Sequence, residues 1–185
     1  MFETKGRCVI ITGAAQGMGK EFSRILLKSG AKVCISDIDE IKGNETKALF
    51  QQHFGLDDSG VCFVKCNVSK KEDWPKLWDT AEILLKGPIE ILINNAGLNP
   101  SVSVPRICKL SLLSLLLPHL KKKEFQLKKS NNGFLKHGWE KLLDVMLMGA
   151  ARGIYTAIER MGRSKGGQGG RIVNITSTAG ITVSK

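Results

Sequence analysis

The chain has 185 residues, of which 42% are hydrophobic, enough for one core of ordinary size and no second domain. Its net charge is +11, but residues 99–136 hold eight Lys or Arg and one Glu, so this segment contributes +7. Outside the segment the charge is ordinary, which argues against a nucleic-acid-binding protein, and the absence of a secretory signal at the start predicts a cytoplasmic location.

The first strong pattern is VIITGAAQGMGK at residues 9–20, an apolar strand that runs into a glycine-rich turn and then a helix. Gly13, Gly17 and Gly19 let the backbone turn tightly and come close to a pyrophosphate. The charge of that group would face the free N–H groups and the positive end of the helix. This arrangement predicts a dinucleotide site.

The helix expected near 17–29 and the strand expected near 32–36 continue the pattern. The helix stops at a glycine and carries an apolar stripe of Phe22, Ile25, Leu26 and Leu27. The strand ends at Asp37, whose carboxylate can accept hydrogen bonds from both adenosine ribose hydroxyls and would repel a 2′-phosphate. Neither Gln16 nor Ile38 supplies a compensating positive charge, so the sequence favours NAD over NADP.

Two simpler interpretations remain open for these residues. Glycine-rich turns also close ordinary strand-to-helix connections. Asp37 could instead begin the helix near Asp39 and Glu40, because acidic residues favour a helix N-terminus. The order of strand, turn, helix, strand and acid within about thirty residues favours the dinucleotide site.

The remaining pattern alternates between strands and helices. Strands are predicted near 7–12, 60–66, 89–93 and 170–176, and helices near 40–54, 70–86 and 138–162. This alternation predicts an α/β fold with a doubly wound parallel sheet of Rossmann type, in the strand order 3-2-1-4-5, with its ligand over the carboxyl ends of the strands. Five candidate residues fall at or just past such ends: Gly13, Asp37, Asn67, Asn95 and Ser177.

Four ordered segments carry a family resemblance. They are TGxxxGxG at residues 12–19, an acid-Val pair that appears here as Asn67-Val68, NNAG at residues 94–97, and a serine that closes the fifth strand at Ser177. On these motifs the chain resembles the short-chain dehydrogenase/reductase family. The added segments GWEKLL and GGQGGRIVNI resemble one NAD-dependent branch of it, over residues 1–98 and 137–185.

The resemblance implies an NAD-dependent oxidoreductase that moves a hydride from a secondary alcohol carbon to nicotinamide and yields a ketone. In such enzymes a tyrosine takes the hydroxyl proton, a lysine lowers the pKa of that tyrosine, and a serine orients the oxygen. Ser177 matches the serine, although it could also be a polar strand end. The resemblance implies cofactor contacts at Gly13, Gln16, Gly17, Met18, Gly19, Asp37, Ile38, Cys66, Asn67, Val68 and Asn95.

The resemblance also implies residues that this chain does not supply. The tyrosine and lysine would follow residue 185, and Met146 stands where the family has a proton-relaying asparagine. Tyr155 lies in the middle of the long helix and is no replacement. We therefore expect the chain as written, an incomplete fragment, to be inactive, and a catalytically dead NAD-binding or interaction module is the rival interpretation.

The family resemblance also bears on how the chain assembles. The resemblance implies a homodimer that uses the helix near 138–162 and a further helix after residue 185. Without that helix we expect dimerisation to be impaired and the fifth strand to be an exposed edge.

The segment 98–136 is a basic insert in the single domain formed by residues 1–185, and it exceeds the about 12 to 15 residues usual for loops. Its apolar run is shorter than the about 20 residues a bilayer requires, and Pro118 interrupts it, so no membrane span is expected. It could be a solvated, poorly ordered loop, an amphipathic element for anionic lipid or a partner, or translated non-coding sequence within 98–135. We favour the last hypothesis, and an mRNA that retains the segment in frame would count against it.

Five cysteines, an odd number, are scattered at positions 8, 34, 62, 66 and 108, mostly within apolar strand patterns. We expect them to be reduced thiols in the core. Cys62 and Cys66 have no second pair of ligands nearby, and the three histidines are isolated, so no metal site is predicted.

Overall fold

The structure is a computed structural model that describes residues 3–98 and 140–176. Within these ranges five parallel strands form one sheet in the order β3-β2-β1-β4-β5, which confirms the predicted doubly wound topology. The strands are β1 (Cys8–Thr12), β2 (Lys32–Asp37), β3 (Val61–Lys65), β4 (Ile89–Asn94) and β5 (Arg171–Asn174).

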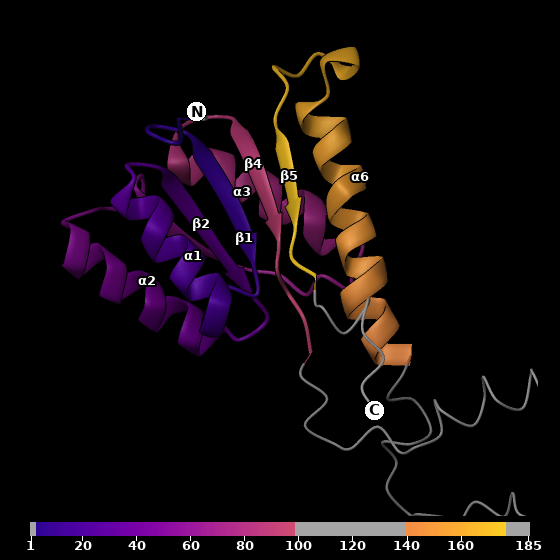
Figure 1. Ribbon diagram of the computed structural model, residues 1–185, viewed down its shortest axis with the longest axis horizontal. Helices are drawn as coiled ribbons and strands as arrows, with labels where there is room; N and C mark the ends of the chain where they lie inside the picture. Colours follow the sequence, from indigo (N-terminus) through magenta and orange to yellow (C-terminus); the bar gives the residue numbers. More distant parts are fainter. Residues whose placement is uncertain (1–2, 99–139, 177–185) are drawn as a thin grey trace, which may run out of the picture.

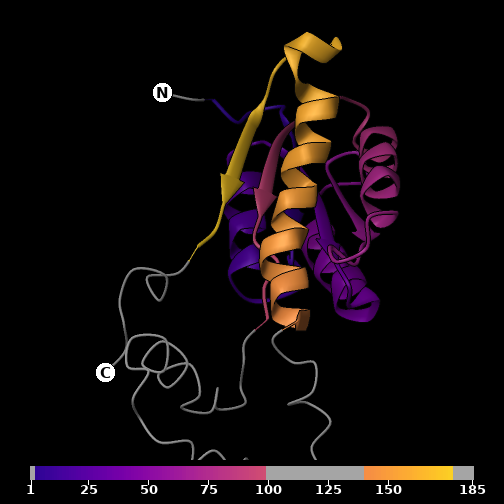
Figure 2. The ribbon, with the colours of Figure 1, turned by 90° about the vertical axis from the view of Figure 1, so that its right-hand side faces the viewer.

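Helices cover both faces of the sheet (Figures 1 and 2). On one face α1 (Gly17–Lys28) and α2 (Glu40–Phe54) pack against alternate residues of the central strands, such as Val9 and Ile11. On the other face α3 (Asp73–Leu85) and α6 (Ala150–Met161) bury a second cluster that includes Trp74 and Trp78. This two-sided burial explains the near-continuous apolar sequence of β1.

Two predicted helices differ in detail from the structure. On α1 Phe22, Leu26 and Leu27 pack against the core as predicted, but Ile25 is 53% exposed, and the buried positions also include Gly19 and Ser23. The helix predicted near 70–86 begins at Asp73. Pro75 explains that start, because proline lacks the N–H that a helix interior requires and is tolerated in the first turn.

The long helix predicted near 138–162 does not have α-helical geometry along its whole length. A π-helical segment, η1 (Leu143–Gly149), runs directly into α6, and a short 3-10 turn, η2 (Arg163–Lys165), follows it. The extra residue in a π-turn shifts which side chains face inward. As a result Met146 and Leu147 are about half exposed, while Gly149 is buried against Val68.

Four of the five cysteines lie within the described residues, and all four are buried free thiols, as expected. Burial raises the pKa of the Cys66 thiol to about 12, with the Asp73 carboxylate adding to the effect. Cys108, Ser177 and the insert 98–136, except for its first residue, lie outside the described residues. Within the described ranges, no helix has the length and apolar composition that a bilayer crossing requires.

Candidate functional site

The glycine-rich turn between β1 and α1 is shaped by steric contacts. Gly13 and Gly17 have φ values of +65° and +59°, which side chains rarely adopt. A Cβ atom on Gly13 would lie 2.7 Å from the Cα of Ala96, and one on Gly19 would lie 2.4 Å from the carbonyl oxygen of Gly13. The turn is therefore closed tightly onto the end of β4, and Gly17 faces open space.

The N-terminus of α1 is available for an anion. Gln16 precedes the helix with extended backbone, and its side chain forms no capping hydrogen bond. The first turn carries no acidic residue. The first N–H groups of a helix have no partner within the helix and share its positive dipole end, so the N–H groups of residues 17–19 suit a phosphate.

Asp37 joins the glycine turn to the start of α2. Its carboxylate accepts the backbone N–H of Ala15 at 3.0 Å through one oxygen and that of Asp39 at 3.0 Å through the other. The N-cap of α2 is Asp39, which accepts the N–H of Lys42 at 3.1 Å. Asp37 is thus not the capping residue, and because a carboxylate has about four acceptor sites it retains acceptor capacity for a ligand.

Sequence reasoning missed a cation at this site. Lys42 extends from the first turn of α2 and donates from Nζ to Oε1 of Gln16 at 3.2 Å. The same Nζ lies 3.4 Å from a carboxylate oxygen of Asp39, which offsets its charge. The sequence feature that could have indicated this cation was the position of Lys42 on the first turn of the helix that follows Asp37.

A second network fastens β4 to the glycine turn. The hydroxyl oxygen of Thr12 accepts the N–H groups of Asn95 and Ala96, both at 3.1 Å. The side-chain amide of Asn95 donates to the carbonyl oxygens of Thr12 and Gly13, both at 3.0 Å. Oδ1 of Asn95 is buried and has no hydrogen-bond partner among the described residues. This oxygen is an acceptor that a ligand hydroxyl could use.

The other predicted contact residues differ in what they offer. Met18 and Ile38 are exposed apolar side chains beside the turn, at 64% and 61%. Cys66 and Val68 are buried, so the Cys66 thiol does not face the surface and only its backbone could contact a ligand. Asn67 uses its side-chain oxygen to accept from the N–H and hydroxyl of Ser69.

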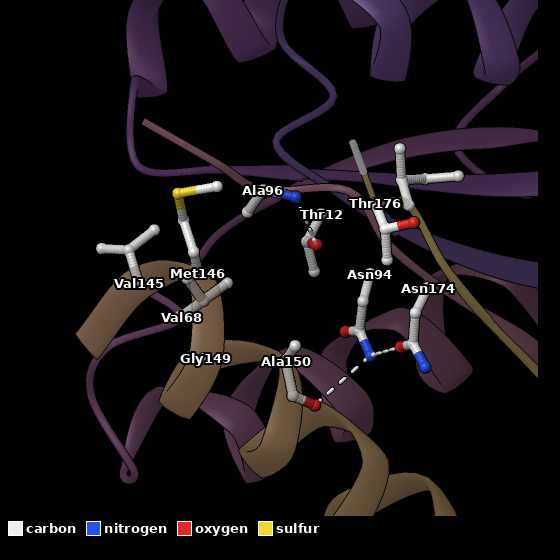
Figure 3. A pocket seen from close by; sticks show the side chains of 11 residues that line it. Thr12, Val68, Asn94, Ala96, Val145, Met146, Gly149, Ala150, Asn174 and Thr176 are labelled. Atoms are coloured by element: carbon white, nitrogen blue, oxygen red, sulfur yellow. Dashed lines mark hydrogen bonds between the residues drawn. The ribbon is translucent and has the colours of Figure 1, made fainter. Parts of the chain in front are cut away.

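A small pocket opens between the ends of β4 and β5 and the π-helical segment (Figure 3). In it Asn94 donates to Oδ1 of Asn174 at 2.9 Å and to the carbonyl oxygen of Ala150 at 3.3 Å. Met146 and Thr176 also line this pocket. Asn94 and Asn174 were not predicted as site residues, although each ends a strand at the edge where ligands bind.

The single tyrosine of the chain does not line this pocket. Tyr155 is 73% exposed on α6. The pocket residues from the long helix are Val145, Met146, Gly149 and Ala150. The pocket therefore contains no phenol hydroxyl from the described residues.

The fold places this chain in the doubly wound α/β class, and the comparisons define the family. A family profile described as short chain dehydrogenase matches residues 7–114, which is more than half of the chain. The chain therefore belongs to the short chain dehydrogenase family.

Curated relatives support that assignment. The 15-hydroxyprostaglandin dehydrogenase [NAD(+)] of Rattus norvegicus is 30% identical over 178 residues, covering 95% of this chain and 52% of the relative. A mitochondrial borneol dehydrogenase of Lavandula x intermedia is 38% identical over 96 residues, covering 51% of this chain and 33% of the relative. The chain spans about half the length of the 15-hydroxyprostaglandin dehydrogenases that it matches.

Solved structures agree. A short chain dehydrogenase from Mycobacterium smegmatis has a TM-score of 0.72 at 26% identity, covering 98% of this chain and 62% of that one. A short chain dehydrogenase/reductase from Burkholderia phymatum, solved in complex with NAD, has a TM-score of 0.71 at 23% identity, covering 100% of this chain and 53% of that one. The second likeness concerns the fold alone.

Proposed function

We propose that this chain forms the NAD-binding part of a short-chain alcohol dehydrogenase. One observation carries the proposal. An uncapped helix N-terminus, a tight glycine turn and the Asp37 carboxylate meet at the carboxyl ends of β1 and β2. The relatives named as NAD-dependent dehydrogenases support the same cofactor.

The residues present fit this cofactor. The N–H groups of residues 17–19 would hold the pyrophosphate, and Asp37 would accept the adenosine ribose hydroxyls. Ile38 offers exposed apolar surface for the adenine, and the unpartnered Oδ1 of Asn95 offers an acceptor for the nicotinamide ribose. The buried Val68 would contact the cofactor from the wall of the pocket between β4, β5 and the π-helical segment. NAD, when bound, supplies the ring carbon that accepts a hydride from an alcohol.

The remaining predicted contact residues add no further reactive or charged group to this proposed site. Gln16, Met18 and Gly19 belong to the turn and the first turn of α1. Cys66 and Asn67 would contact the adenosine through their backbone, because their side chains are buried or engaged with Ser69. Ser177 remains the proposed catalytic residue that orients the substrate oxygen.

The proposed reaction is the oxidation of a secondary alcohol to a ketone. As the specific substrate group we propose the 15-hydroxyl of a prostaglandin, because relatives at about 30% identity are named 15-hydroxyprostaglandin dehydrogenases. We further propose that residues 1–185 form one domain with 98–136 as an insert, and that the protein is cytoplasmic. A homodimer through η1 and α6 is the proposed assembly.

We propose that the chain as written does not turn over. Its one tyrosine is exposed on α6, and Met146 lines the pocket where a polar relay would be needed. General acid-base groups contribute about 10² to 10⁴ in rate, so their loss leaves turnover near background. The same two observations favour a second candidate function, an NAD-binding or interaction module that uses the basic insert.

The test compares NAD and NADP binding to the chain by calorimetry. We expect NAD to bind more tightly than NADP by about tenfold or more, because the Asp37 carboxylate would repel a 2′-phosphate. Asp37→Ala should weaken NAD and bring the two affinities together. Asp37→Asn keeps one acceptor oxygen and removes the charge, so it separates the charge from the backbone contacts.

Asp58→Ala is the matched control, since that exposed carboxylate lies between α2 and β3 and pairs with Lys47 at 3.0 Å. An unchanged preference in both Asp37 variants would overturn the assignment of this residue. Failure of the parent chain to bind either dinucleotide would overturn the proposed function.

A further inference from the structure

Lys42 brings a cation to the glycine turn of the proposed dinucleotide site. Its Nζ donates to Oε1 of Gln16 at 3.2 Å, and Gln16 is the residue that precedes α1. The neighbouring Ala15 donates its backbone N–H to the Asp37 carboxylate at 3.0 Å. The ammonium group of Lys42 and the carboxylate of Asp37 are therefore each hydrogen-bonded to one of two adjacent residues of the turn.

The other charged side chains at the start of α2 are engaged. Glu40 accepts from Nζ of Lys65 at 2.9 Å, so a cation at the end of β3 offsets its charge. Asp39 accepts the backbone N–H of Lys42 at 3.1 Å as the N-cap of α2, and its second oxygen lies 3.4 Å from Nζ of Lys42. Asp37 and Asp39 thus remain as negative charges beside the turn, and Lys42 opposes them.

The repulsion that Asp37 would exert on an anion is moderated by its own hydrogen bonds. One carboxylate oxygen accepts from Ala15 and the other from Asp39, both at 3.0 Å. The adjoining N-terminus of α1 has no side-chain cap and no acidic residue in its first turn. Its N–H groups carry partial positive charge, so a phosphate near Asp37 would meet positive as well as negative groups.

Lys42 has both the freedom and the donor capacity to reach such a phosphate. Its side chain is about half exposed. An ammonium group has three N–H donors, and its contacts with Gln16 and Asp39 leave one for a ligand oxygen. Ile38 and Ile41, which lie between Asp37 and Lys42 in the chain, are exposed, so the surface here is open to a ligand.

We propose that Lys42 is a specificity-determining residue of the dinucleotide site, and that its ammonium group contacts a phosphate on the adenosine ribose, the group that distinguishes NADP from NAD. The role of Lys42 rests on the proposed function, because it requires a dinucleotide at the glycine turn. Asp37 alone would exclude NADP, whereas Asp37 and Lys42 together leave NADP as a weaker second cofactor. Gln16 is a positioning residue that holds Nζ beside the turn.

The test measures NAD and NADP binding by calorimetry in the parent chain and in Lys42→Met, which keeps an unbranched side chain without the charge. We expect the affinity for NADP to fall roughly fivefold, as for one ion pair near 4 Å in water, and that for NAD to change by less than about twofold. The loss should shrink at about 1 M salt, which screens exposed charges. A packing defect would not respond to salt in this way.

Lys47→Met is the matched control, because Lys47 lies on the same helix, carries the same charge and pairs with Asp58 at 3.0 Å. It should leave the ratio of the NADP and NAD affinities unchanged. Gln16→Ala should weaken NADP binding less than Lys42→Met, since it releases the ammonium group without removing its charge.

Adenosine 2′,5′-bisphosphate and adenosine 5′-phosphate repeat the comparison with the adenosine half of the cofactor alone. Lys42→Met should weaken binding of the first and leave that of the second unchanged. Equal losses for NAD and NADP, equal effects of Lys42→Met and Lys47→Met, or equal losses for the 2′,5′- and 3′,5′-bisphosphates would each overturn the role of Lys42 while the proposed function stands. A parent chain that binds neither dinucleotide would overturn both.

Discussion

Two glycine-rich turns lie at opposite edges of this sheet, and they use glycine for different purposes. In the turn between β1 and α1, Gly13 and Gly19 permit close approach of backbone to backbone and leave the start of α1 uncapped. In the loop between α6 and β5, glycine N–H groups are consumed by hydrogen bonds within the loop.

A run of glycines is therefore not by itself a nucleotide site. What decides is whether backbone N–H groups remain free at a helix N-terminus. The first turn meets that condition because a strand leads into it and a helix leads out. The second leads from a helix to a strand, so it offers no helix N-terminus to a ligand.

The largest expected effect comes from Gly19→Ala. The new Cβ would lie 2.4 Å from the carbonyl oxygen of Gly13 and 2.5 Å from Nδ2 of Asn95. We expect a loss of about 3 kcal/mol in the free energy of unfolding, since overpacking against backbone cannot relax easily, and loss of NAD binding. Urea unfolding and calorimetry with NAD measure the two effects.

Gly166→Ala is the control in the second loop. Its φ of +86° makes alanine costly by about 1 to 2 kcal/mol, but a Cβ there meets no atom within 4 Å. NAD affinity should not change. Equal effects of the two variants on NAD binding would remove the distinction between the turns.

A smaller effect is expected from Thr12→Val, which preserves shape. It removes the buried hydroxyl that accepts the half-buried N–H groups of Asn95 and Ala96. We expect a loss of about 2 kcal/mol in unfolding free energy. Thr156→Val should cost far less, because the Thr156 hydroxyl only donates to a carbonyl oxygen of its own helix, that of Arg152. Similar losses at both threonines would contradict the role of Thr12 in fastening the turn.

Much of this architecture could be predicted from sequence. The order of strands followed from alternating apolar runs and right-handed crossovers, and Asp37 was correctly placed beside the glycine turn because both follow strand ends. Lys42 was missed because its contact with Gln16 joins residues 26 apart in sequence through side chains. The π-helical segment was missed because hydrophobic periodicity assumes 3.6 residues per turn, and the inward position of Gly149 breaks that period.

The buried thiol of Cys66, directly after β3, gives a pH test of burial at the other side of the sheet from β5. The pKa of Cys66 is raised to about 12 by burial, above its ordinary 9.0, so the folded chain keeps the neutral thiol. The unfolded chain releases that proton first, so this contribution to stability is complete below pH 9 and is lost as pH rises from 9 to 12. Between pH 9 and 10 the loss is about 1 kcal/mol for one such thiol.

Cys66→Ala should therefore make stability less sensitive to alkaline pH than in the parent chain. Burial raises the pKa of Cys8, and a hydrogen bond with Cys62, together with burial, raises that of Cys34, so a residual slope is expected. Urea unfolding at pH 8, 9 and 10 measures the difference. Identical slopes in the two proteins would show that Cys66 ionises freely in the folded state.

The smallest effect is expected at the exposed edge strand. Ile11, Ile93 and Val173 are register partners across β1, β4 and β5, and their exposure rises from 0% to 8% to 43%. Val173→Thr should change the unfolding free energy by less than about 0.5 kcal/mol, because the side chain is already in contact with water.

The same change in the centre of the sheet provides the contrast. Val9 is fully buried in β1, so Val9→Thr places a hydroxyl in an apolar environment at a cost of about 1 to 3 kcal/mol. If Val173→Thr cost as much as Val9→Thr, β5 would be covered in solution by an element or partner that buries its outer face. Light scattering of the same samples distinguishes self-association through this edge, which the threonine should weaken by removing apolar surface.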